Sequence, residues 1–108
     1  MREEQAAILF QALANADRLK VIRALVAAGP AGLSAGEIAA SISASPSRTS
    51  FHLATLSETG IIHSQRHSRT LIYSVDFQSL GGLANFLLND CCKGNSVALS
   101  CCVNSNCK

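Results

Sequence analysis

All five cysteines of this 108-residue chain lie after residue 90, as two adjacent pairs and one single residue: Cys91 with Cys92, Cys101 with Cys102, and Cys107. Thiolates are soft ligands, so they favour soft ions such as trivalent arsenic, trivalent antimony, cuprous copper or cadmium over hard cations. Structural zinc usually takes cysteines separated by about two to four intervening residues, although five cysteines could still supply four zinc ligands. Oxidation to a disulfide is a third option, for which only Lys93 lies near in sequence to favour a reactive thiolate.

A helix with a polar, basic beginning is predicted from Pro46 to Gly60. Ser45 is a good N-cap, Pro46 suits the first helical position, and Gly60 is the residue type that closes helices. Within the helix, Thr49, Leu53 and Leu56 recur at helical spacing and form an inward stripe. The outward side chains on the first turns are then Ser47, Arg48, Ser50, Phe51 and His52. Such short polar and cationic groups are typical of a helix that enters a DNA groove.

The pattern changes to a two-residue period directly after Gly60. Residues 61–66 and 70–75 read as two strands, joined by a tight polar loop of His67, Ser68 and Arg69. The segment 44–75 holds three arginines and all three histidines but a single acid, Glu58. A basic helix followed at once by a hairpin with a cationic tip is the layout of a winged helix-turn-helix, in which the wing grips the phosphate backbone.

Four further helices are expected around this motif. They are a first helix from Glu3 to Ala14, a second capped by Asn15 or Asp17 with a stripe of Leu19, Ile22, Leu25 and Val26, a short third opened by the capping box Ser34–Glu37, and a last one from Asp76 to Asn89. The break at residues 43–45 matches the turn of a helix-turn-helix. The last helix has a wide apolar face, which either covers its own core or pairs with a second copy of the chain. The predicted fold is therefore mostly α with a β-hairpin wing (α+β), a homodimer through the first and last helices.

Bulk composition fits a single small domain followed by a different segment. The chain is 48% hydrophobic with a net charge of only +2, so the distribution of charge carries more information than its sum. We expect a DNA-binding and dimerisation domain at residues 1–90 and a cysteine-rich tail at 91–108. No apolar run is long enough to span a bilayer, and Arg2, Glu3 and Glu4 do not resemble a signal peptide, so a cytoplasmic location is expected.

Several motifs taken together resemble the ArsR/SmtB family of metal- and metalloid-responsive repressors. They are residues 16–19 (ADRL), 50–56 (SFHLATL), 59–62 (TGII) and 66–69 (RHSR) with Tyr73, and the resemblance covers roughly Ile8 to Phe86. It implies a homodimeric repressor that leaves double-stranded operator DNA when its inducer binds. By the match, bases or phosphates would be contacted by Ser47, Arg48, Ser50, His52, Arg66 and Arg69.

The same resemblance suggests where the inducer binds. The chain has no cysteine before Cys91, which removes the Cys-x-Cys site near the recognition helix, and no histidine in the last helix, which removes the zinc site of other members. What remains resembles the branch that senses trivalent arsenic or antimony through a vicinal cysteine pair at the end of the last helix. Cys91 and Cys92 with Cys101 or Cys102 are then the expected ligands, and Cys107 is the weakest candidate.

Two other functions fit the same residues. One is a repressor that senses oxidation through its thiols, and the other is a zinc-stabilised winged-helix module that binds a partner without regulated release of DNA. Catalysis is not expected, because His52, His63 and His67 belong to no signature of a nucleophile or a general base.

Overall fold

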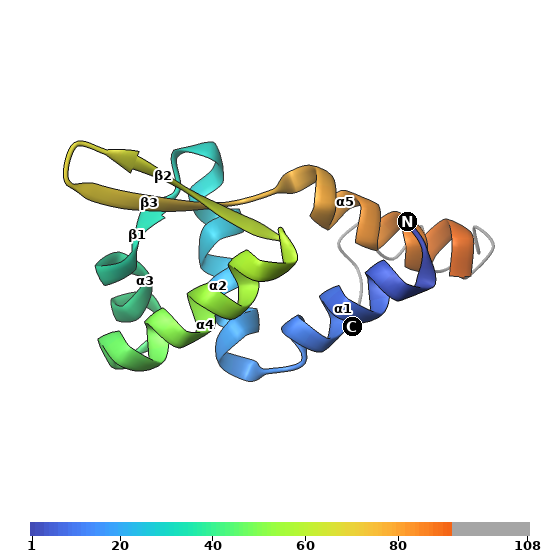
Figure 1. The fold of residues 1–108 in the computed structure, drawn as a ribbon, viewed down its shortest axis with the longest axis horizontal. Helices are drawn as coiled ribbons and strands as arrows, with labels where there is room; N and C mark the ends of the chain where they lie inside the picture. Colours follow the sequence, from blue (N-terminus) through green and yellow to red (C-terminus); the bar gives the residue numbers. More distant parts are fainter. Residues whose placement is uncertain (92–108) are drawn as a thin grey trace.

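The chain folds into a body of helices with a small antiparallel sheet that reaches out at one end (Figure 1). The structure is a computed structural model that describes residues 1–91, with the side chains of residues 1–88. In chain order the elements are α1 (Glu3–Leu13), α2 (Ala16–Ala28), a 3-10 turn (Gly29–Ala31), β1 (Leu33–Ser34), α3 (Ala35–Ile42), α4 (Pro46–Thr59), β2 (Ile62–His67), β3 (Thr70–Val75), α5 (Phe77–Asn85) and a π-helical segment (Phe86–Cys91).

Side-chain caps explain where four of these helices begin. Asn15 caps α2 by accepting from the N–H groups of residues 17 and 18, and Asp76 caps α5 in the same way. Ser34 and Glu37 form the expected capping box at α3, and Ser45 caps α4. Of the two candidate caps for α2, Asn15 takes the role, which leaves the carboxylate of Asp17 for another contact.

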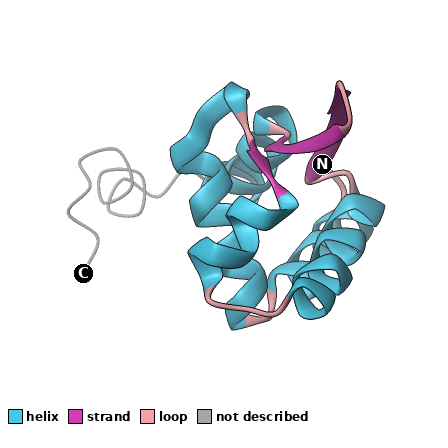
Figure 2. Ribbon diagram, turned by 90° about the vertical axis from the view of Figure 1, so that its left-hand side faces the viewer, coloured by secondary structure: helices cyan, strands magenta, loops and turns pink. Residues whose placement is uncertain are grey.

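The sheet has three strands in the order β1, β3, β2, one more than the sequence predicts. The short strand β1 pairs with β3 through Leu33 opposite Tyr73 and Ser34 opposite Ile72. Two residues are too few for a period-2 pattern, so only the fold shows this strand. Figure 2, with the strands in magenta, shows the sheet beside the helices. Through β1, the sheet connects the wing to the beginning of α3.

The core lies between α1, α2, α3, α4 and the base of the hairpin. Its largest fully buried side chains are Val21, Leu25, Ile38, Thr49, Leu53, Leu56, Ile61 and Ile62. On α2 the expected stripe is only half right, because Ile22 and Leu25 are buried while Leu19 and Val26 stay 48% and 42% exposed. Val21 is fully buried instead, on a helix that packs mainly against α3 and β3.

The last helix differs from the expected regular helix. α5 is α-helical only to Asn85, and the chain continues in wider π-helical turns from Phe86 to Cys91. Leu83 is its buried residue, while Leu87 is 39% exposed. None of the helices in residues 1–91 is long and apolar enough to cross a membrane.

Candidate nucleic-acid interface

The first turns of α4 carry most of the residues predicted to contact DNA. Ser43 adopts a left-handed conformation with φ of 55°, which ends α3 and turns the chain into α4. The hydroxyl of Ser45 then accepts from the backbone N–H of Arg48 at 3.2 Å. The side chains of Ser47, Arg48 and Ser50 are exposed, as expected, and Thr49, Leu53 and Leu56 form the buried stripe.

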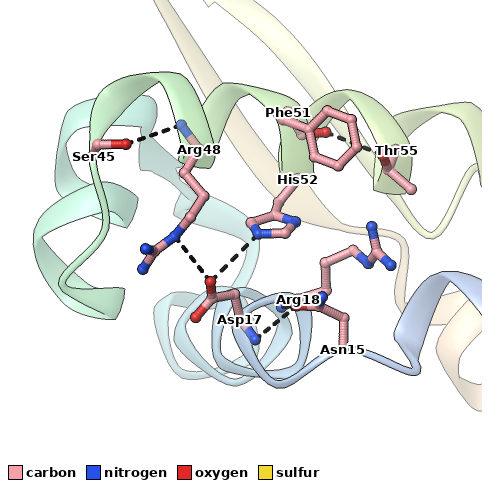
Figure 3. Close-up of polar contacts among 8 residues, drawn as sticks. All are labelled: Asn15, Asp17, Arg18, Ser45, Arg48, Phe51, His52 and Thr55. Carbon is pink, nitrogen blue, oxygen red and sulfur yellow. Dashed lines mark hydrogen bonds and ion pairs between the residues drawn. The ribbon is translucent and has the colours of Figure 1, made fainter.

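His52 does not lie where the sequence suggested. It is only 5% exposed, and its Nε2 lies 3.4 Å from Oδ2 of Asp17 on α2 (Figure 3). The expectation of an outward side chain was wrong because His52 comes three residues after Thr49, so both fall on the face of α4 that packs on α2. In this position the imidazole ring lies on the side of α4 that faces α2 and not on its exposed face.

Asp17 is the residue of this site that sequence reasoning missed. Its Oδ2 lies 3.0 Å from Nε of Arg48 as well as 3.4 Å from His52, so one carboxylate from α2 holds two side chains of α4. The contact uses Nε of Arg48, so the outer Nη groups of the planar guanidinium can still bind a phosphate. The Arg48 side chain remains 52% exposed. No local pattern predicts this contact, because residues 17 and 48 meet only through the packing of α2 against α4.

The wing presents the other two predicted DNA contacts. Arg66 on β2 and Arg69 in the turn are both exposed, and the pairing of β2 with β3 places both at the turn end of the hairpin. Figure 1 shows that this end of the hairpin reaches away from the helices. The loop is shorter than expected: His67 belongs to β2 and pairs with Thr70, so only Ser68 and Arg69 form the turn. Ser68 takes a φ of 57°, a conformation that tight hairpin turns require.

These residues form two groups, one on α4 and one on the wing, and both suit a nucleic acid. α4 offers hydroxyl and guanidinium groups that can hydrogen-bond to base edges or phosphates, and the wing offers two arginines on a separate element. Among the side chains of residues 1–88, no three or more His, Cys, Asp or Glu come together in a way that could hold a metal ion. Cys92, Cys101, Cys102 and Cys107 lie outside the described residues, and so does the side chain of Cys91.

Comparisons with known proteins agree with this geometry. A family model described as a helix-turn-helix domain matches residues 13–65. The HTH-type transcriptional regulator YgaV of Escherichia coli is 36% identical over 89 residues, which cover 82% of this chain and 88% of YgaV. These relatives are transcriptional regulators and not enzymes.

Two solved structures share the fold. One is the homodimeric winged helix-turn-helix DNA-binding domain of Mb0332 from Mycobacterium bovis, a possible ArsR-family regulator, with 23% identity, a TM-score of 0.62 and coverage of 81% of this chain and 84% of that one. The other is a possible transcriptional regulator for arsenical resistance, with 28% identity, a TM-score of 0.63 and coverage of 74% and 79%. The chain therefore belongs to the helix-turn-helix transcriptional regulators, and its winged fold is that of ArsR-like proteins.

Proposed function

We propose that this regulator is a metalloid-responsive repressor, which binds operator DNA as a homodimer and leaves it when trivalent arsenic or antimony binds its C-terminal thiolates. The observation that carries the proposal is that all five cysteines lie in the last eighteen residues, beginning with Cys91 at the end of the π-helical segment that follows α5. A structural role explains one buried cysteine well, but five in one short segment point to a ligand. Because such a repressor acts on DNA, its place is the cytoplasm.

Homodimerisation is supported by apolar side chains that the single chain leaves uncovered. Ile8 and Phe10 on α1 are 56% and 37% exposed, and Leu87 after α5 is 39% exposed. A groove of about 480 Å³ lies between α1, α4 and α5, lined by Met1, Ile8, Leu9 and Gly82 among others. A second copy would cover this surface. Two copies would also double the small number of arginines that face DNA.

The donor set supports a metalloid as the inducer. Trivalent arsenic binds three thiolates in a pyramid, and each thiol loses its proton as an arsenic–sulfur bond replaces an arsenic–oxygen bond, with release of water. Cys91 and Cys92 with Cys101 or Cys102 supply three thiols, whereas Cys107 is needed least. Similarity to a possible regulator for arsenical resistance agrees with this choice.

Coupling between inducer and DNA needs little energy. The first of the thiols, Cys91, is the last residue of the π-helical segment after α5, and this end of the chain belongs to the proposed dimer contact. A ligand bound there can therefore change the distance between the two α4 helices. In a helix-turn-helix dimer this distance is about 34 Å, one turn of DNA. A coupling free energy of about 1–3 kcal/mol weakens operator binding about 5–150-fold, which is sufficient for a switch.

Fluorescence anisotropy of the reduced protein on DNA from its own upstream region tests the proposal. Arsenite, zinc and an oxidant are titrated in parallel, and arsenite is expected to release the DNA. Variants Cys91→Ser and Cys92→Ser should abolish the response to arsenite, while Cys107→Ser, the matched control, should keep it. Release by oxidant alone would instead establish a thiol redox sensor. No specific DNA binding at all, with stoichiometric zinc in the protein, would leave the zinc-stabilised interaction module standing.

A further inference from the structure

Phe51 is the most exposed of the large apolar side chains in the described part of the chain. It is 64% exposed, although its neighbours in the sequence, His52 and Leu53, are both buried. An exposed aromatic ring loses the favourable free energy that burial would give, so an uncovered ring on a functional face indicates a partner.

The surroundings of Phe51 direct it away from its own core. Its ring meets that of His52 edge to face, with 5.7 Å between centroids and 68° between planes. His52 in turn is directed toward Asp17, on the inner side of α4 (Figure 3). The hydroxyl of Thr55, one turn later, donates to the carbonyl oxygen of Phe51 at 3.1 Å. Phe51 therefore stands on the outer face of α4, one turn after Ser47 and beside Ser50.

The chemistry of a DNA groove leaves few partners for such a ring. Ser47, Arg48 and Ser50 can hydrogen-bond to base edges and phosphates, but a phenyl ring cannot. The apolar group that a base pair presents in the major groove is the C5-methyl of thymine, and Phe is among the side chains that contact it. Insertion of an apolar wedge between base pairs belongs to proteins that bind the minor groove, which is too narrow for α4.

We propose that Phe51 is a specificity-determining residue that packs on a thymine C5-methyl group in each half of the operator. This inference rests on the proposed binding of operator DNA, and it adds which base the exposed face of α4 selects and by what contact. It is independent of which ligand the cysteines bind.

Deoxyuridine provides a direct test, because it differs from thymidine only by lacking the C5-methyl and keeps every hydrogen-bonding group. An operator defined by footprinting of the upstream region is synthesised with each thymine replaced in turn, symmetrically in both half-sites. Burying one methyl group corresponds to about a fourfold change in affinity per half-site. Replacing the contacted thymine in both half-sites should therefore weaken wild-type binding about 15-fold.

Variants of Phe51 decide whether this ring is responsible. Phe51→Ala should bind the thymine operator about as weakly as wild type binds the deoxyuridine operator, and its affinities for the two should agree within about twofold. Phe51→Leu, which keeps an apolar side chain, should retain part of the preference for thymine. Phe77→Ala, which removes an exposed ring (44%) from α5, is the matched control and should keep the full preference.

Each outcome distinguishes this inference from the proposed function. If Phe51→Ala keeps the deoxyuridine penalty, or if no thymine gives one in wild type, the assignment of Phe51 is wrong while operator binding stands. If wild type prefers no sequence at all, both proposals fail. Little change in the thermal unfolding of Phe51→Ala is expected, because the ring is 64% exposed and its contact with His52 is a single edge-to-face one. An unchanged unfolding temperature shows that lost affinity is not lost folding.

Discussion

At the scale of single residues, the contact of Asp17 with Arg48 and His52 joins the stability of the domain to the geometry of its DNA-binding face. Asp17→Ala removes the carboxylate that lies 3.4 Å from Nε2 of the buried His52 and 3.0 Å from Nε of Arg48, and we expect the free energy of unfolding to fall by about 1–3 kcal/mol. Urea denaturation measures this. Glu4→Ala is the control, because the Arg2–Glu4 pair is 80% and 72% exposed and should contribute less than about 1 kcal/mol. Equal effects of the two substitutions would show that the Asp17 contact has no special role.

Gly32 is a second residue whose identity the fold requires. Its φ is +70°, and a Cβ at this position would collide with the carbonyl oxygen of Tyr73 and come within 2.8 Å of Cγ2 of Ile72. Gly29 has a similar φ of +69° but open space around it. We therefore expect Gly29→Ala to cost about 1–3 kcal/mol for backbone strain alone. Gly32→Ala should cost clearly more, measured by thermal unfolding. A smaller loss than for Gly29→Ala would contradict the close approach of Gly32 to β3.

At the scale of elements, the start of α3 depends on a charged cap that responds to pH. The backbone N–H of Ser34 donates to Oε1 of Glu37 at 2.9 Å, and this bond, helped by the Ser34 side chain, lowers the pKa of Glu37 below its ordinary 4.5. A depressed pKa in the folded state means that the stabilisation is present above pH 4.5 and is lost as pH falls through the folded value.

The variant Glu37→Gln tests this dependence on pH. It keeps an acceptor but carries no charge, so we expect it to be less stable than wild type at pH 7 and equally stable once Glu37 is protonated. Urea unfolding across this range measures the difference, and NMR titration of the Glu37 side chain follows the pKa directly. Ser34→Ala should move that pKa upward. If the difference in the free energy of unfolding between wild type and Glu37→Gln is the same at all pH values, the charge of Glu37 does not contribute to the cap.

α1 is the element on which the proposed dimer depends, through its exposed apolar side chains. Ile8→Glu places a charge at a side chain that is 56% exposed in the single chain, so the fold should tolerate it while the dimer should dissociate. Sedimentation velocity distinguishes the two species. Leu19→Glu is the matched control on α2, where the side chain is 48% exposed, and it should remain dimeric. A dimeric Ile8→Glu protein would place the interface elsewhere.

At the scale of the whole molecule, the proposed contact with DNA uses α4 and the wing together. Each lost phosphate contact reduces the slope of log affinity against log salt by about 0.9, so Arg66→Ala or Arg69→Ala should each reduce it by about 1.8 in a dimer. Anisotropy over a range of KCl concentrations gives the slope. Arg2→Ala, which removes a charge from the other end of the molecule, should leave it unchanged. An unaltered slope for both wing variants would exclude the hairpin from DNA contact.

Much of this architecture could be predicted from local sequence. Ser45, Pro46 and Gly60 set the bounds of α4, and the Ser34–Glu37 box set the start of α3, because a cap acts within three or four residues of itself. The two strands of the wing could also be predicted from local sequence, with bounds that differ by one residue in β2. The exposed positions of Ser47, Arg48, Ser50, Arg66 and Arg69 followed from these elements.

Other features were decided only when distant segments packed together. His52 looked like a surface residue by type, yet the crossing of α2 and α4 buries it beside Asp17. Val21 is buried where Leu19 and Val26 were expected, because the elements that pack on α2 decide which of its sides is covered. β1 exists only because β3 lies next to it. A helical pattern gives the period of the apolar positions, but the neighbouring elements decide which side of the helix they bury.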